Sequence, residues 1–149
     1  MLHVLVYGDS LTWGIIPDTR RRLPFAARWP GVMEADLIDA GHRVRVTEDC
    51  LNGRRTAWDD PLLEGLEQRI EINSPLALAI VMLGTNDFQS MHQLNAWHSA
   101  QGLAAVVRAI RRAPLEPGMP VPPVLLVAPP AIHAQRGSIA PKFDGAEGR

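Results

Sequence analysis

The chain has 149 residues, of which 46% are apolar and 21% charged, and its formal net charge is -1. This length fits one domain, residues 1–149, with a substantial core. Because the net charge is close to zero, it gives no reason to expect nucleic acid as a partner. The single cysteine, Cys50, excludes an intramolecular disulfide and a cysteine-rich metal site, and it is expected to be a small buried hydrophobe. No apolar run is long enough to span a bilayer, and the chain enters a strand at once without a leader pattern. We therefore expect a cytoplasmic protein with no membrane partner.

Strand-like and helix-like segments alternate along the chain, which indicates βαβ units around a parallel sheet and an α/β fold class. Hydrophobic patterning predicts strands at residues 2–7, 43–47, 76–83 and 124–128, and helices at residues 29–40, 61–72 and 95–112. Capping and turn residues mark the ends of these helices. The marker residues are Pro30, Gly41, Asp59 or Asp60, Pro61 and Asn95.

Two of the strands are expected at the edges of the sheet. In residues 43–47 only Val44 and Val46 are apolar, which suits a strand covered on one face. Residues 124–127 are all apolar, yet the tail from 131 to 149 has no strand pattern that could cover them. Because an uncovered apolar edge invites aggregation, we expect a further strand and helix after Arg149.

Three polar segments follow the first three strands. Ser10 comes after the first strand, Gly53 after the second and Asn86 after the third. In an open parallel sheet the carboxyl ends of the strands form the crevice that binds ligands. Acyl transfer needs a nucleophile and hydrogen-bond donors to the oxyanion. The Ser10 hydroxyl could be the nucleophile, and the Gly53 N–H and the Asn86 side-chain amide could be the donors. Taken singly, each also has a purely local interpretation, as a helix cap for Ser10 and Asn86 or a turn for Gly53.

The segments around these residues resemble a known family. Gly8-Asp9-Ser10-Leu11-Thr12-Trp13-Gly14 resembles the first block of the SGNH (GDSL-type) hydrolases, and Gly84-Thr85-Asn86-Asp87 resembles their third. The second block falls on Gly53. Further matches, to the arylesterase and acyltransferase branch, are Arg28-Trp29, Arg54 to Thr56, Asp59-Asp60-Pro61 and Ala128-Pro129-Pro130.

The resemblance implies a flavodoxin-like three-layer sandwich and a serine esterase or acyltransferase that acts on small acyl esters. Ser10 would be the nucleophile, and the N–H of Ser10, the N–H of Gly53 and the Asn86 amide would stabilise the oxyanion. Asp9, Trp13 and His133 would line the substrate site, with no metal and no cofactor. Some family members form multimers, so a homo-oligomer stays open.

The family's usual general-base motif is not found in the late part of this sequence. A late Asp-x-x-His block provides the base in the family, and no such block follows Asn86 here. Of the five histidines, His92 and His133 are expected at the correct end of the sheet, whereas His3 and His42 are at the other end. We expect a companion C-terminal fragment to carry the Asp/His pair.

Two other functions remain open from the residues alone. The first is a non-catalytic module that has the family fold, lacks the base and holds an acyl or sugar ligand in the crevice. The second is a flavodoxin-like domain that binds phosphate through Ser10, Thr12 and Thr85, although no glycine-rich cradle supports it.

Overall fold

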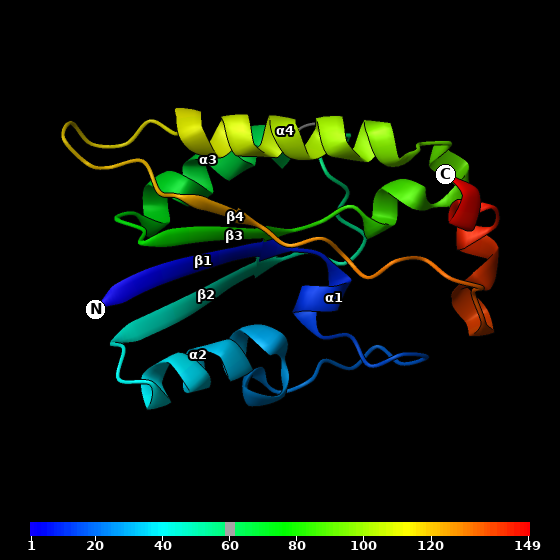
Figure 1. Cartoon of the computed structure of the whole chain (residues 1–149), viewed down its shortest axis with the longest axis horizontal. Coiled ribbons are helices and arrows are strands. Elements are labelled where there is room, and N and C mark those ends of the chain that lie inside the picture. Colours follow the sequence, from blue (N-terminus) through cyan, green and yellow to red (C-terminus); the bar gives the residue numbers. More distant parts are fainter. Residues whose placement is uncertain (59–61) are drawn as a thin grey trace.

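A four-stranded parallel sheet with helices on both faces forms the centre of the molecule (Figure 1). The computed structural model describes residues 1–58 and 62–149. The strands lie in the order β2-β1-β3-β4. Their bounds are Leu2–Gly8 for β1, Val44–Cys50 for β2, Leu78–Met82 for β3 and Val124–Leu126 for β4. The α/β prediction is confirmed, and so are both predicted edge strands.

The register of the sheet brings the ends of three strands to one rim. Gly8, the last residue of β1, lies opposite Cys50 of β2 and Met82 of β3. All three strands run in parallel, so the loops that follow them emerge side by side. The short helix α1, Ser10–Trp13, begins at this rim (Figure 1).

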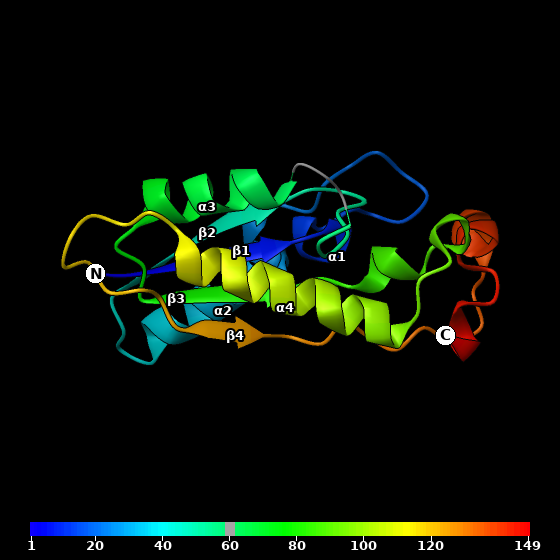
Figure 2. The same ribbon diagram turned by 90° about the horizontal axis from the view of Figure 1, so that it is seen from above.

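The two faces of the sheet are covered differently. Helices α3, Leu62–Asn73, and α4, Ala96–Arg112, pack on one face and enclose the larger core (Figure 2). Side chains from these two helices are fully buried there: Leu66, Ile70, Val106 and Ile110. Helix α2, Trp29–Asp39, covers the other face over the valines of β1 and β2.

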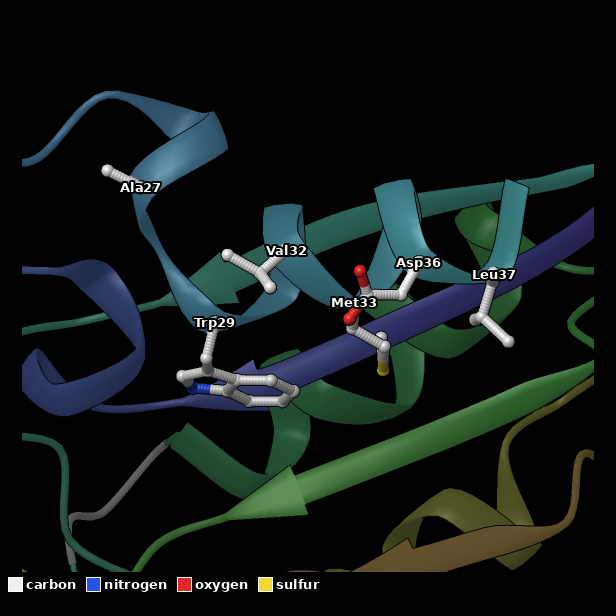
Figure 3. Close-up of a pocket in the computed structure, with 6 residues that line it drawn as sticks. All are labelled: Ala27, Trp29, Val32, Met33, Asp36 and Leu37. Atoms are coloured by element: carbon white, nitrogen blue, oxygen red, sulfur yellow. The ribbon is translucent and has the colours of Figure 1, made fainter. Parts of the chain in front are cut away.

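An open apolar groove of about 640 Å³ runs along α2. Figure 3 shows Trp29, Met33 and Leu37 extending from α2 toward the sheet, with Val32 and Asp36 beside them. The first three side chains pack partly buried against the β1–β2 core. Val32 is 45% exposed, so the groove is open along its length.

Strand β2 continues three residues beyond its predicted end, through two acidic residues that interrupt the apolar alternation. Arg28 and Arg22 pair with Glu48 at 2.6 and 2.9 Å, and the Glu48 side chain is only 7% exposed. Asp49 pairs with Arg54 and Arg69. These cations compensate the acidic side chains at the end of the strand, a tertiary effect that local pattern does not reveal. Arg22, in the segment between α1 and α2, therefore has a defined partner.

The remaining predicted elements agree with the structure to within a few residues. Asn95 caps α4 as predicted, through its side chain and the N–H of His98 at 3.1 Å. The predicted cap Asp59 or Asp60 and the first-turn Pro61 lie outside the described residues. Within residues 1–58 and 62–149, no helix is long and apolar enough to cross a membrane.

Strand β4 forms one edge of the sheet, and the tail follows it. Leu125 and Leu126 are about half exposed, at 48% and 47%, which confirms the apolar edge. The tail forms two 3₁₀ helices, Gly137–Phe143 and Ala146–Gly148, and buries Phe143 and Ala146. It returns to the rim of the sheet, where the Arg149 guanidinium donates to the Phe88 carbonyl at 2.6 Å.

Candidate active site

Ser10 is the first residue of α1, and Asp9 is the residue that caps this helix. The Asp9 carboxylate accepts a hydrogen bond from the Leu11 N–H at 2.9 Å. The alternative in which Ser10 is the cap is therefore wrong. Thr12, fully buried, accepts from the Trp29 indole N–H at 3.2 Å and ties α1 to α2. Ser10 is thus held by a short fixed helix at the rim and remains partly exposed.

Gly53 lies in the tight turn that follows β2. The Arg54 N–H donates to the Leu51 carbonyl at 3.1 Å, so Asn52 and Gly53 form the centre of a turn, as their local interpretation predicts. Gly53 has φ of 81°, a value that favours glycine. No atom lies within 4 Å of the position that a Cβ would take, so this side of the turn is open.

The amide of Asn86 connects the three predicted loops. Asn86 lies in the 3₁₀ helix η2, Thr85–Phe88, and is only 6% exposed. Its Nδ2 donates to Asp9 Oδ2 at 3.2 Å and to the Arg54 carbonyl at 3.0 Å. Asp9 precedes Ser10 and Arg54 follows Gly53. One amide therefore links the residues adjacent to the candidate nucleophile and to the candidate glycine donor.

Arg54 reinforces this junction, a role that its place in the sequence motif does not reveal. The guanidinium donates to the Gly8 carbonyl at 3.1 Å, to the Asp49 carbonyl at 2.6 Å and to the Asp49 carboxylate at 2.8 Å. It also lies 4.0 Å from the centre of the Tyr7 ring. Arg54 is 3% exposed, so these contacts fix the loop after β2 against the end of β1.

A second buried connection joins the loops after β2 and β3. Both oxygens of Asp87 accept from Thr56, one from its N–H at 3.0 Å and one from its hydroxyl at 2.8 Å. Asp87 is fully buried. Gly102 of α4 makes room for this pair, because a Cβ there would stand 1.9 Å from the Thr56 hydroxyl oxygen.

Burial has a clear electrostatic effect on Asp9. Desolvation raises the pKa of Asp9 from 3.8 to about 6, although the Leu11 N–H and the Arg54 cation act in the opposite direction. Asp9 is 1% exposed and holds Leu11 and Asn86 in place. Its direct contact with substrate stays a prediction. Cys50, predicted to be buried, is only partly buried. Desolvation still raises the pKa of its thiol to about 12, in line with an unreactive thiol.

The other predicted site residues are more exposed. Trp13 is half-buried, with the Arg22 guanidinium 4.8 Å from the centre of its ring. His133 lies exposed in the loop after β4, and its carbonyl accepts from Gln135. Their contact with a ligand stays a prediction.

Two of the histidines, His3 and His98, have side-chain hydrogen bonds with structural roles. His3, the second residue of β1, bonds Thr47 in the middle of β2 at 2.9 Å. His98 takes part in the cap of α4. Within residues 1–58 and 62–149, no three His, Cys, Asp or Glu side chains gather in a way that could hold a metal ion.

Comparison with known proteins identifies the family. The model of the GDSL-like Lipase/Acylhydrolase family matches residues 6–143. This range includes all three candidate segments and covers most of the chain. The chain therefore belongs to the GDSL-like lipase/acylhydrolase family, also called SGNH hydrolases, whose members are ester hydrolases. No curated protein matches the chain.

Solved structures with the same fold are also similar in sequence. A carbohydrate acetylesterase family member from Sinorhizobium meliloti is 32% identical with a TM-score of 0.88, over 99% of this chain and 72% of that one. Est24, a carbohydrate acetylesterase from the same organism, is 33% identical with a TM-score of 0.87, over 99% and 74%. The inhibitor-bound aryl esterase of M. smegmatis is 30% identical with a TM-score of 0.87, over 99% and 74%.

The close approach of Thr56 to α4 predicts that an alanine at position 102 destabilises the protein. Gly→Ala within a helix ordinarily stabilises by roughly 0.5–1 kcal/mol. At Gly102 the added methyl group would displace the Thr56 hydroxyl, so Gly102→Ala should lower the free energy of unfolding. Gly65→Ala in α3 is the matched control, because the nearest atom there is the end of the flexible Arg69 side chain. Denaturant unfolding of both variants measures the difference; equal stabilisation would contradict the packing described.

The raised pKa of Asp9 predicts a pH-dependent contribution to stability. An acid whose pKa is higher in the folded state than in the unfolded state destabilises the fold where it is ionised, and this cost falls as the pH drops below about 6. From pH 7.5 to 5, the parent should gain about 1–2 kcal/mol of unfolding free energy relative to Asp9→Asn. Denaturant unfolding of both proteins at each pH gives this difference. A difference that is constant with pH, or of opposite sign, would refute it.

Proposed function

We propose that this protein is a serine ester hydrolase that removes small acyl groups from esters through an acyl-enzyme on Ser10. The observation that carries the proposal is the pair of hydrogen bonds from the Asn86 amide to Asp9 and to the Arg54 carbonyl. These bonds support a common location for the hydroxyl and two of the donors that such a reaction needs.

In the proposed reaction the Ser10 hydroxyl oxygen attacks the acyl carbon while a general base accepts its proton. The carbonyl oxygen becomes an oxyanion, which the N–H groups of Ser10 and Gly53 and the Asn86 amide would stabilise. The alcohol leaves with a proton, and water then hydrolyses the acyl-enzyme. Transfer of the acyl group to another alcohol follows the same steps with that alcohol in place of water. Loss of one oxyanion donor typically costs about 10²–10³ in turnover.

The proposed place of the acyl group is the cavity beside Thr85, whose lining does not include Ser10 itself. An apolar cavity of about 450 Å³ adjoins Thr85, which immediately precedes Asn86. Leu83, Phe88, Leu103 and Ile132 are among its lining residues. The relatives named above, carbohydrate acetylesterases and an aryl esterase, favour small esters as substrates. Trp13 and His133 are proposed to border the alcohol part.

For the general base we propose a companion segment that carries the Asp/His pair. Its support is the edge of β4, which pairs with β3 as the last strand of the described sheet. The half-exposed Leu125 and Leu126 offer apolar contacts to an added strand. An intact-mass measurement of active material tests this: turnover by a sample that contains only the 149-residue chain would contradict it.

Replacement of Ser10 tests the proposed function directly. In active material that includes the companion segment, Ser10→Ala should abolish labelling by an activated phosphonate and reduce turnover of a chromogenic acetate ester by at least about 10³-fold, since it removes the nucleophile. Ser138→Ala, at an exposed serine whose hydroxyl bonds Asp18, is the control and should behave as the parent. Equal labelling of Ser10→Ala and the parent would refute the assignment. A parent that binds esters in the presence of the companion segment without labelling or turnover would favour the non-catalytic module.

A further inference from the structure

The side chain of Gln89 holds the oxygen end of the Asn86 amide. Gln89 Nε2 donates to Asn86 Oδ1 at 2.8 Å. Gln89 follows Asn86 by three residues, immediately after the 3₁₀ helix η2. Side chains three residues apart lie over one another in such a helix. The contact is therefore a direct result of the local backbone.

The Asn86 amide can present either its nitrogen or its oxygen to Asp9 and Arg54, since a half-turn of the amide exchanges the two ends. In the observed orientation the two N–H donors face two acceptors, the Asp9 carboxylate and the Arg54 carbonyl. The oxygen faces the Gln89 donor. After a half-turn, the oxygen would face the carboxylate and the carbonyl, and the N–H groups would face the Gln89 N–H. The contacts with Asp9 and Arg54 would then be repulsive, and the contact with Gln89 would also be repulsive in the orientation that the Gln89 amide has here.

We propose that Gln89 is a positioning residue that keeps the N–H groups of Asn86 on the side shared with Asp9 and Arg54. The inference rests on the proposed function, in which a developing oxyanion takes over one of these N–H groups. An amide held in advance needs no reorganisation when the negative charge forms. An amide turned the other way would present oxygen to the oxyanion and oppose the reaction.

Three substitutions at position 89 separate the effect of the hydrogen-bond donor from the effect of the side chain's size. Gln89→Lys keeps a donor, Gln89→Met keeps the approximate length without a donor, and Gln89→Glu places an acceptor against Asn86 Oδ1. In active material that includes the companion segment, we expect kcat for a chromogenic acetate ester to fall about 10- to 100-fold in Gln89→Glu, a part of the effect of losing an oxyanion donor, with KM within about twofold. The kcat of Gln89→Met should fall less, and the kcat of Gln89→Lys should stay within about threefold of the parent value.

The NMR signals of the Asn86 side-chain NH₂ group give a readout that does not need turnover. Asn86→Asp removes these signals and so assigns them in the 16.4 kDa chain. The signals should shift strongly in Gln89→Glu and stay close to the parent positions in Gln89→Lys. If Gln89→Glu does not fold, the comparison of Gln89→Met with Gln89→Lys decides by the same criteria.

The outcomes distinguish this inference from the proposed function. Parent-like kcat and parent-like Asn86 signals in both Gln89→Glu and Gln89→Met would overturn the role of Gln89. A loss of kcat in Gln89→Lys as large as in Gln89→Glu would also overturn it, because a donor would then not suffice. A parent that carries the companion segment and still shows neither turnover nor Ser10 labelling would refute the proposed function alone. In that case the Asn86 signals still decide whether Gln89 orients the amide.

Discussion

The rim of the sheet depends on the buried hydrogen bonds between Asp87 and Thr56. Asp87 is fully buried, and Thr56 meets each of its oxygens with a separate donor. Hydrogen bonds to an ionised carboxylate are strong, and a buried oxygen left without a partner is costly. This pair fixes the loop after β2 against the loop after β3. Gly53 and Asn86 can act on one ligand only if those two loops keep this relation.

The end of β1 joins the same network through Asp9, a buried carboxylate whose ionisation is unfavourable. Arg54 holds the Gly8 carbonyl, and Asn86 holds the Asp9 carboxylate. Burial of Asp9 raises its pKa to about 6, so the site keeps a carboxylate that is costly to ionise. Stability is commonly sacrificed at functional sites in this way, where a fixed arrangement of polar groups is needed. The network connects Asp9, which precedes Ser10, with Arg54, which follows Gly53, and it leaves Ser10 partly exposed.

The sequence predicts the elements and the location of the site better than the contacts within it. The apolar runs of β1 and β3 and the caps of α4 are local signals, and they predict the layered α/β fold. The last residues of β2 are missed because Glu48 and Asp49 depend on arginines from other elements. Ser10, Gly53 and Asn86 are found because each follows a strand. The Thr56–Asp87 pair spans 31 residues, and the small residue that accommodates it, Gly102, lies in a distant helix, so no local pattern reveals them.

A crystal structure of the protein after reaction with an activated phosphonate tests the central claim most directly. Phosphorus is expected on the Ser10 hydroxyl oxygen. A phosphonyl oxygen is also expected about 2.7–3.1 Å from the Ser10 N–H, the Gly53 N–H and the Asn86 amide nitrogen. A phosphonyl oxygen that faces away from Gly53 and Asn86, or phosphorus bonded to another side chain, would contradict the claim.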